Sequence, residues 1–129
     1  MKTGLVVFAH GSRVEAANEA VRAVASALAR AGPFEKVEAA FLELGRPDLA
    51  GAVQRLAADG ARRVLIIPYF LTLGIHLERD LPAIVDAIAK SHEGVAIRVT
   101  SPLDGHPALV RILEDRARDG LENWDAPAS

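Results

Sequence analysis

Three side chains that can bind a metal ion follow three separate apolar segments of the sequence. His10 comes after the first segment, Glu43 after the second, and His76 after the third, on the stretch "PYFLTLGIH". Two imidazoles and a carboxylate suit a borderline divalent ion such as Zn²⁺, Co²⁺, Ni²⁺ or Fe²⁺, and three protein ligands leave coordination positions open. An open position allows the ion to exchange. The residue types therefore predict an exchangeable divalent-metal site, provided that the fold brings the three together.

The segments that carry these residues alternate between strand and helix patterns. Apolar or β-branched runs predict strands at residues 5–9, 37–42, 63–67 and 96–100. Amphipathic spacing predicts a first helix that begins after Ser12 and stops at Gly32, and further helices at about residues 47–59, 80–90 and 107–121. The run "VLII" is apolar on both faces, which is typical of a parallel sheet covered by helices on both sides. We therefore predict an α/β fold, a single three-layer domain over residues 1–129 with a frayed tail from about residue 121.

The expected strand order explains how distant residues reach one site. Right-handed crossovers restrict the possible orders of the four parallel strands, and we predict the order 2-1-3-4. In this order the chain leaves strand 1 on one side and later restarts on the other, and ligands of open α/β sheets bind at such a switch point, outside the carboxyl ends of the strands. His10, Glu43 and His76 all follow strand ends, so we expect them to converge at this edge.

Glycines accompany two of the three candidate ligands. Gly11 follows His10 and Gly74 precedes His76, and each allows a sharp turn or a close approach of the backbone to a ligand. A single histidine at a strand end is commonly only a polar residue with ordinary partners, so the predicted site depends on the whole set. Ser12 lies three residues before Glu15, a spacing that predicts a capping box and not a site residue.

Composition excludes several classes of protein. The chain has 129 residues, a net charge of -2 and a pI near 6.1, so no basic excess supports binding to nucleic acid or to an anionic membrane. It has no cysteine, which excludes disulfides, thiolate metal sites and thiol nucleophiles. The apolar stretch near residue 5 is too short for a signal peptide or a membrane span. A cytoplasmic location is expected.

Four motifs resemble a known family. "FAHGSR", "FLELGRP", "IPYFLTLGIHLERDLP" and "GHPALVRILEDR" are similar to the short CbiX-type sirohydrochlorin chelatases, which are related to the SirB ferrochelatases and to the methanogen nickel chelatase. The resemblance covers residues 4 to about 118, and its most specific part is the pair of histidine motifs. It implies a chelatase-like fold and an enzyme that inserts Co²⁺, Fe²⁺ or Ni²⁺ into sirohydrochlorin without consuming nucleotide.

The resemblance also implies roles for individual residues. It makes His10, Glu43 and His76 the ligands of the incoming metal ion, which is a substrate, and no permanently bound cofactor is expected. We expect one of these three residues to accept a pyrrole proton as well. Short members of the family are homodimers, so the resemblance implies a homodimer that binds a tetrapyrrole.

Six further residues are candidates for contacts with the substrate. Two arginines beside the predicted cleft suit its carboxylates, because a guanidinium forms bidentate hydrogen bonds with a carboxylate. Apolar side chains after the third strand suit the ring face, although they serve as core packing equally often. The candidates are Arg13, Arg46, Tyr69, Phe70, Leu71 and Gly74.

Two other functions are compatible with the sequence. A histidine followed by glycine after a first strand also occurs in phosphohistidine enzymes, but these have an arginine immediately before the histidine, where this chain has Ala9. The second alternative is a protein that only carries a divalent metal or holds a tetrapyrrole. The same residues would bind in a carrier and in a chelatase, so the sequence does not separate the two.

Overall fold

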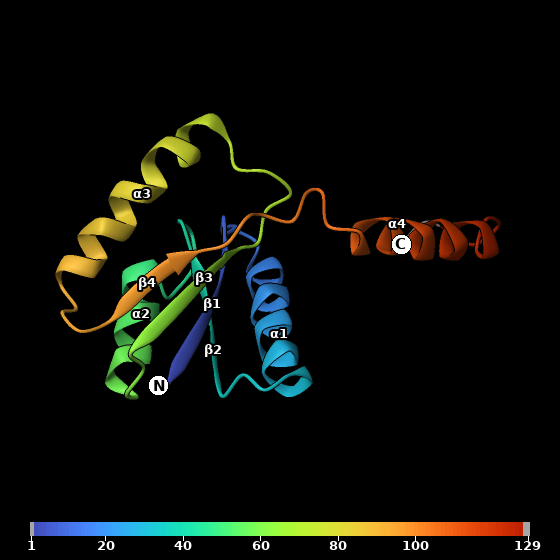
Figure 1. Ribbon diagram of the computed structural model, residues 1–129. Helices are drawn as coiled ribbons and strands as arrows, with labels where there is room; N and C mark the ends of the chain where they lie inside the picture. The colour runs from blue at the N-terminus through green and yellow to red at the C-terminus, as the bar shows by residue number, and fades with distance from the viewer. Residues whose placement is uncertain (1, 128–129) are drawn as a thin grey trace.

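The computed structural model describes residues 2–127, in which strands and helices alternate along the chain (Figure 1). The strands are shorter than the helices, and each strand is followed by one helix. The elements are β1 Thr3–Ala9, α1 Glu15–Ala31, β2 Lys36–Phe41, α2 Leu49–Ala58, β3 Arg63–Pro68, α3 Ile75–Lys90, β4 Ala96–Val99 and α4 Ala108–Glu122.

The four strands form one parallel sheet in the order β2-β1-β3-β4. The order confirms the sequence prediction. β1 lies in the middle, with Phe8 beside Ala40 of β2 and beside Pro68 of β3. The carboxyl ends of β1, β2 and β3 therefore lie next to one another, at the edge where the candidate ligands were expected.

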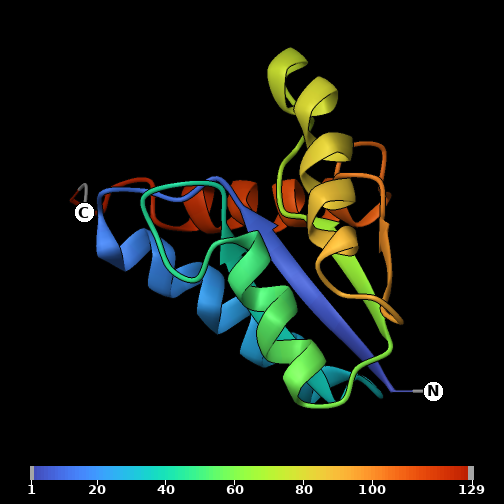
Figure 2. The ribbon, with the colours of Figure 1, turned by 90° about the vertical axis from the view of Figure 1, so that its left-hand side faces the viewer.

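The face of the sheet that packs on α2 and α3 contains the larger core. Val6, Phe8 and Ile66 are buried there, and Leu56 of α2 and Leu81 of α3 cover them. The two helices lie on the same side of the sheet in Figure 2. Buried side chains of the neighbouring strands β1 and β3 thus point to the same two helices, α2 and α3, as in other parallel sheets covered by helices.

The opposite face of the sheet packs on α1 alone. Val7, Ala39 and Phe41 form a second, smaller core with Ala25, and Val21 of α1 packs beside it. α1 contacts β1 and β2 and covers that half of the face. The fold thus has three layers: α1 on one side, the sheet in the middle, and α2 with α3 on the other side. This confirms the predicted three-layer arrangement. α4 does not join either layer, because it extends away from the sheet and contains no buried residue (Figure 1).

Two helix starts differ from the predictions. α3 begins at Ile75, five residues before the expected start, with extended Gly74 as its N-cap residue and Glu78 in its first turn. Pro82 lies inside α3, two residues after the expected start at residue 80. α1 has Val14 as its N-cap residue, and the Ser12 hydroxyl accepts a hydrogen bond from the Val14 amide at 3.0 Å, so the predicted capping box does not form.

No helix within residues 2–127 combines the length and the apolar character that crossing a bilayer requires. The cytoplasmic location stays a prediction, as does the division of residues 1–129 into one domain. Residues 1, 128 and 129 lie outside the described part of the chain.

Replacing Leu56 by alanine tests the larger core. Leu56 is 1% exposed and packs in the core between α2 and the sheet. We expect Leu56→Ala to lower the free energy of unfolding by about 2–5 kcal/mol, because it removes buried methyl groups and leaves a cavity. Urea denaturation measures the change. Gln54→Ala, an exposed position in the same helix, serves as the control and should change the free energy by less than about 0.5 kcal/mol.

Candidate functional site

His10 and Glu43 face each other at the carboxyl ends of β1 and β2. The backbone pairing of the two strands continues past their ends, because the amide of Leu42 donates to the Ala9 carbonyl at 2.9 Å and the amide of Glu43 donates to the His10 carbonyl at 3.0 Å. The His10 Nε2 and Glu43 Oε1 atoms are 3.8 Å apart, and the two side chains are 60% and 57% exposed. The strand pairing thus presents an imidazole and a carboxylate together to solvent.

The other ring nitrogen of His10 determines what this pair can bind. Nδ1 lies 3.2 Å from the Gly11 carbonyl oxygen. An N–H at Nδ1 donates to that oxygen and leaves the lone pair of Nε2 directed toward Glu43. An ion held at about 2.0–2.2 Å by each of two donor atoms needs these atoms roughly 3–3.5 Å apart. A closing movement of a few tenths of an ångström would let Nε2 and Oε1 share one cation.

Gly11 makes the close approach of the two loops possible. Its φ is +95°, and a Cβ atom at this position would lie 1.7 Å from the Glu43 carbonyl oxygen. No side chain fits there, so Gly11 is required for a close approach between the two loops, whereas its approach to a ligand stays a prediction. Gly74 is different, because its φ of -68° is open to any residue and a Cβ atom there would meet nothing within 4 Å. The fold itself therefore does not require glycine at position 74, and its close approach to a ligand stays a prediction.

Asn18 of α1 forms hydrogen bonds with the loop after β1, which carries His10, and with the loop after β2, which carries Glu43. It is 1% exposed and the only buried polar or charged residue among those described. Its Oδ1 accepts from the Ser12 amide at 2.9 Å, and its Nδ2 donates to the carbonyls of Ser12 and Leu44, both at 2.9 Å. One amide group thus fixes both loops through three bonds to their backbone, and its Nδ2 also donates to the Glu15 carboxylate at 3.4 Å.

The Arg22 side chain holds the loop after β2, which carries Glu43. Its guanidinium donates to the Arg46 carbonyl at 2.9 Å, lies 5.1 Å from the centre of the Phe41 ring, and pairs with Glu15 and Glu19. The Arg22 guanidinium, together with the Asn18 amide, holds the pKa of the Glu15 carboxyl below its usual range. The resulting charged cluster orders the stretch between Leu44 and Pro47 beside the site.

His76 reaches the same edge of the sheet but does not meet the other two ligands. It lies in the first turn of α3 and not on a loop as expected, and this end of α3 rises above the sheet (Figures 1 and 2). Its Nδ1 is 3.4 Å from Nη2 of Arg79. Within residues 2–127, no three histidine, aspartate or glutamate side chains come close enough to hold one ion. The structure thus brings together two of the three predicted ligands.

The remaining predicted residues differ in exposure. Arg13 and Arg46 are exposed next to the two loops. Tyr69 and Leu71 are 39% and 64% exposed after β3. Phe70 instead packs on the larger core, with its ring 5.9 Å from that of Phe8. Among the three residues after β3, Tyr69 and Leu71 are therefore the ones available to a ligand.

Four exposed apolar residues at this edge were not predicted. Their exposed fractions run from 37% to 84%, and they follow the same strands as the candidate ligands. They are Val14, Leu42, Leu44 and Ile75. Leu44 also has a φ of 56°, an uncommon conformation for a residue with a side chain. Their residue type did not indicate a place at the site, because an apolar residue beside a strand is normally part of the core. The signal for Asn18 was available, since it is a polar residue within the apolar stripe of the first helix.

The sequence model of the CbiX family matches residues 4–120. This chain belongs to the CbiX family. Among curated relatives, a sirohydrochlorin cobaltochelatase of Methanothermobacter thermautotrophicus is 27% identical, and the match covers 93% of this chain and 94% of the relative. The chloroplastic sirohydrochlorin ferrochelatase of Arabidopsis thaliana is 29% identical over 97% of this chain, which spans only 56% of that protein.

Solved structures of CbiX and SirB proteins share the fold. The CbiX protein of Marinobacter aquaeolei, described as a cobalamin biosynthesis protein, superposes with a TM-score of 0.82 at 29% identity, over 94% of this chain and 98% of that one. SirB of Bacillus subtilis, solved in complex with cobalt, superposes with a TM-score of 0.84 at 24% identity, and the match covers 92% of this chain and 51% of SirB. The SirB likeness shows the fold alone.

The role of Asn18 can be tested by an exchange of similar size. Asn18→Asp places carboxylate oxygens against the carbonyls of Ser12 and Leu44, where two N–H donors now lie. We expect a loss of about 1–3 kcal/mol in the free energy of unfolding, because buried acceptors lose their partners. Urea denaturation gives the value. Gln54→Glu, the same chemical change at an exposed helix position, is the control, and an equal loss in both variants would contradict the role.

Proposed function

We propose that this chain inserts a divalent metal ion, Co²⁺, Fe²⁺ or Ni²⁺, into sirohydrochlorin without consuming nucleotide. The observation that carries the proposal is the solvent-open pair of His10 Nε2 and Glu43 Oε1, 3.8 Å apart. It lies at the edge of the sheet where open α/β folds bind ligands. Curated relatives over nearly the whole chain are named sirohydrochlorin chelatases, and their names supply the substrate.

The proposed site holds the metal ion only briefly. The neutral imidazole of His10 and the carboxylate of Glu43 replace part of the water around the ion, and the pyrrole nitrogens of the substrate then replace the two side chains. His76 serves as the third ligand once the exposed start of α3 moves toward the pair. Insertion releases two pyrrole protons, and a carboxylate or imidazole freed from the metal can accept one of them.

The surroundings of the pair suit a flat macrocycle with acidic groups at its rim. Exposed apolar side chains at the carboxyl edge, such as Tyr69, Leu71 and Leu44, offer contact to a ring face. Phe70 supports them from the core, and Gly74 keeps the start of α3 free of a side chain. Arg13 and Arg46 are exposed on the loops that carry His10 and Glu43, and in the proposed complex they meet substrate carboxylates.

A homodimer is part of the proposal. This chain matches 94% of the cobaltochelatase of M. thermautotrophicus but 56% of the ferrochelatase of A. thaliana and 51% of SirB. One unit of this length therefore occurs both as almost the whole of a relative and as about half of a longer chain. Two copies of this chain would supply the same amount of structure as the longer relatives.

A second candidate function is a carrier that binds a divalent metal without inserting it. It is favoured by the fact that only two of the three predicted ligands meet in the described chain. Turnover separates the two functions. A chelatase converts many equivalents of sirohydrochlorin per chain, whereas a carrier delivers at most one ion per site.

Removal of the ligands should abolish insertion. We expect His10→Ala, Glu43→Gln and His76→Ala each to lower the rate of Co²⁺ insertion by about 100-fold or more, because each removes a ligand or proton acceptor. The absorption change of sirohydrochlorin, followed with catalytic amounts of protein, measures the rate. His92→Ala, at the opposite end of α3, is the matched control and should keep the wild-type rate. Wild-type rates in all three site variants would refute the site.

Arg13 and Arg46 should affect substrate binding more than turnover. We expect Arg13→Gln and Arg46→Gln each to raise the KM for sirohydrochlorin about tenfold, the effect of one lost charge-assisted hydrogen bond, with kcat little changed. Steady-state kinetics at saturating metal separates the two constants. Arg30→Gln, an exposed arginine in the last turn of α1, is the control. An unchanged KM would remove the arginine concerned from the proposal.

A further inference from the structure

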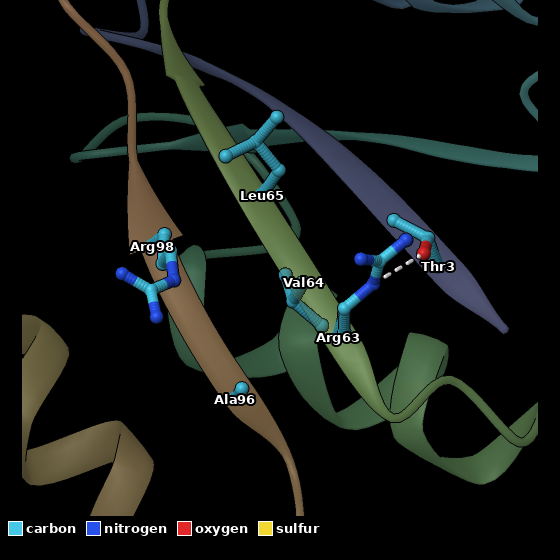
Figure 3. A pocket seen from close by; sticks show the side chains of 6 residues that line it. All are labelled: Thr3, Arg63, Val64, Leu65, Ala96 and Arg98. Atoms are coloured by element: carbon cyan, nitrogen blue, oxygen red, sulfur yellow. Dashed lines mark hydrogen bonds between the residues drawn. The ribbon is translucent and has the colours of Figure 1, made fainter. Parts of the chain in front are cut away.

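One arginine of α3 forms a hydrogen bond with the imidazole of His76. Nη2 of Arg79 lies 3.4 Å from Nδ1 of His76, and the two residues occupy neighbouring positions on one side of the helix. The other arginines that form side-chain hydrogen bonds within residues 2–127 donate to oxygen atoms, as Arg63 does to the Thr3 hydroxyl at 3.0 Å (Figure 3). In this part of the chain, only Arg79 donates to a candidate metal ligand.

The chemistry of the two groups determines the direction of this bond. A guanidinium has five N–H donors and no acceptor. Nδ1 of His76 is therefore the acceptor, and the ring hydrogen is on Nε2. In this state neither ring nitrogen of His76 can bind a cation, because Nε2 carries a hydrogen atom and the lone pair of Nδ1 is already used.

The imidazole of His10 is in the opposite state. Its Nδ1 lies 3.2 Å from a carbonyl oxygen, which can only accept, so the ring hydrogen is on Nδ1. The lone pair of Nε2 is then open and directed toward Glu43. One imidazole is thus ready for a metal ion, whereas the lone pair of the other is occupied by Arg79.

The guanidinium of Arg79 is held by weak bonds. Its Nε donates to Oδ1 of Asp80 at 3.0 Å, but the two side chains are 68% and 54% exposed, and exposed ion pairs contribute little. The 3.4 Å separation from His76 is long for a hydrogen bond. Nη1 forms no hydrogen bond with any residue between 2 and 127. A stronger acceptor can therefore draw the guanidinium away from His76 at small cost.

The position of Arg79 suits a ligand with an apolar face and a carboxylate rim. Ile75 lies one turn before Arg79 on the same side of α3 and is 84% exposed, and Leu71 is 64% exposed in the preceding segment. A flat ring that covers these apolar side chains brings the groups at its rim close to the guanidinium. A carboxylate is the acceptor that a guanidinium binds best, with two parallel charge-assisted hydrogen bonds.

We propose that Arg79 keeps His76 from the metal ion until a carboxylate of the tetrapyrrole draws the guanidinium away. This inference rests on the chelatase function proposed above and concerns the same site. Once Arg79 has left, the freed lone pair of Nδ1 binds the ion that His10 and Glu43 hold, and the ring hydrogen stays on Nε2. The third ligand therefore becomes available only when the macrocycle is present, so that metal and tetrapyrrole strengthen each other's binding.

Binding of Co²⁺ alone tests the block without any turnover. Arg79→Met removes the donor and keeps an unbranched side chain. We expect this variant to bind Co²⁺ about tenfold more tightly than the wild type, because the ion no longer competes with a charged hydrogen bond for Nδ1. Calorimetric titration with a cobalt(II) salt, without tetrapyrrole, measures the affinity. Arg30→Met, the same loss of charge at an exposed position of α1, is the control and should bind Co²⁺ like the wild type.

Removal of His76 separates the block from a general effect of charge. The double variant Arg79→Met/His76→Ala also lacks the arginine, but it has no imidazole to release. It should therefore bind Co²⁺ with the affinity of the single variant His76→Ala. If loss of Arg79 strengthens Co²⁺ binding equally with and without His76, the arginine acts only through its charge and the proposal is wrong. An unchanged affinity in Arg79→Met also refutes it.

Kinetics with sirohydrochlorin test the second half of the proposal. We expect Arg79→Met to raise the KM for sirohydrochlorin about tenfold, because one charge-assisted hydrogen bond to a carboxylate is lost. An unchanged KM means that no substrate carboxylate binds Arg79, and it would overturn the proposal. A wild-type protein that binds Co²⁺ without converting sirohydrochlorin refutes the proposed function instead, and the Co²⁺ titrations still decide whether Arg79 blocks His76.

Discussion

One buried amide group holds together the loops on which the proposed chemistry depends. Asn18 bonds to the backbone of both loops, and the loops approach so closely at Gly11 that no side chain fits between them. Because the bonds from Asn18 to the two loops run to main-chain atoms, the fold itself fixes the positions of His10 and Glu43, and their side chains take no part in holding the loops. The side chains themselves remain exposed, as the proposed exchange of water for metal requires.

The parallel sheet places all of these features on a single edge. Strands β2, β1 and β3 end side by side, so residues from three distant parts of the chain lie at one edge, and His10 and Glu43 meet there although 33 positions separate them. Helices α2 and α3 cover the larger core, which consists of apolar residues. Stability and chemistry thus occupy different parts of the molecule, as is usual for α/β proteins.

Much of the fold could be predicted from the sequence because its signals are local. Apolar runs, glycine and proline positions and the handedness of crossovers gave the four strands, their order and the second helix within two residues. The pairing of His10 with Glu43 followed from adjacent strand ends. The place of His76 did not, because the sequence predicts a helix start at about residue 80, whereas α3 begins five residues earlier and includes His76 in its first turn. The free position of α4 was also beyond prediction, since its apolar stripe indicates that it packs but not on what.

The openness of the His10–Glu43 pair has a consequence for the choice of metal. A rigid cage selects an ion by its radius and preferred geometry, whereas two donors at the surface follow the intrinsic order of affinity, in which Cu²⁺ exceeds Ni²⁺, Co²⁺ and Fe²⁺. Such a site cannot reject the wrong ion by shape. In the proposed reaction, discrimination must then come from which ions are present in the surroundings and from how readily each one passes into the macrocycle.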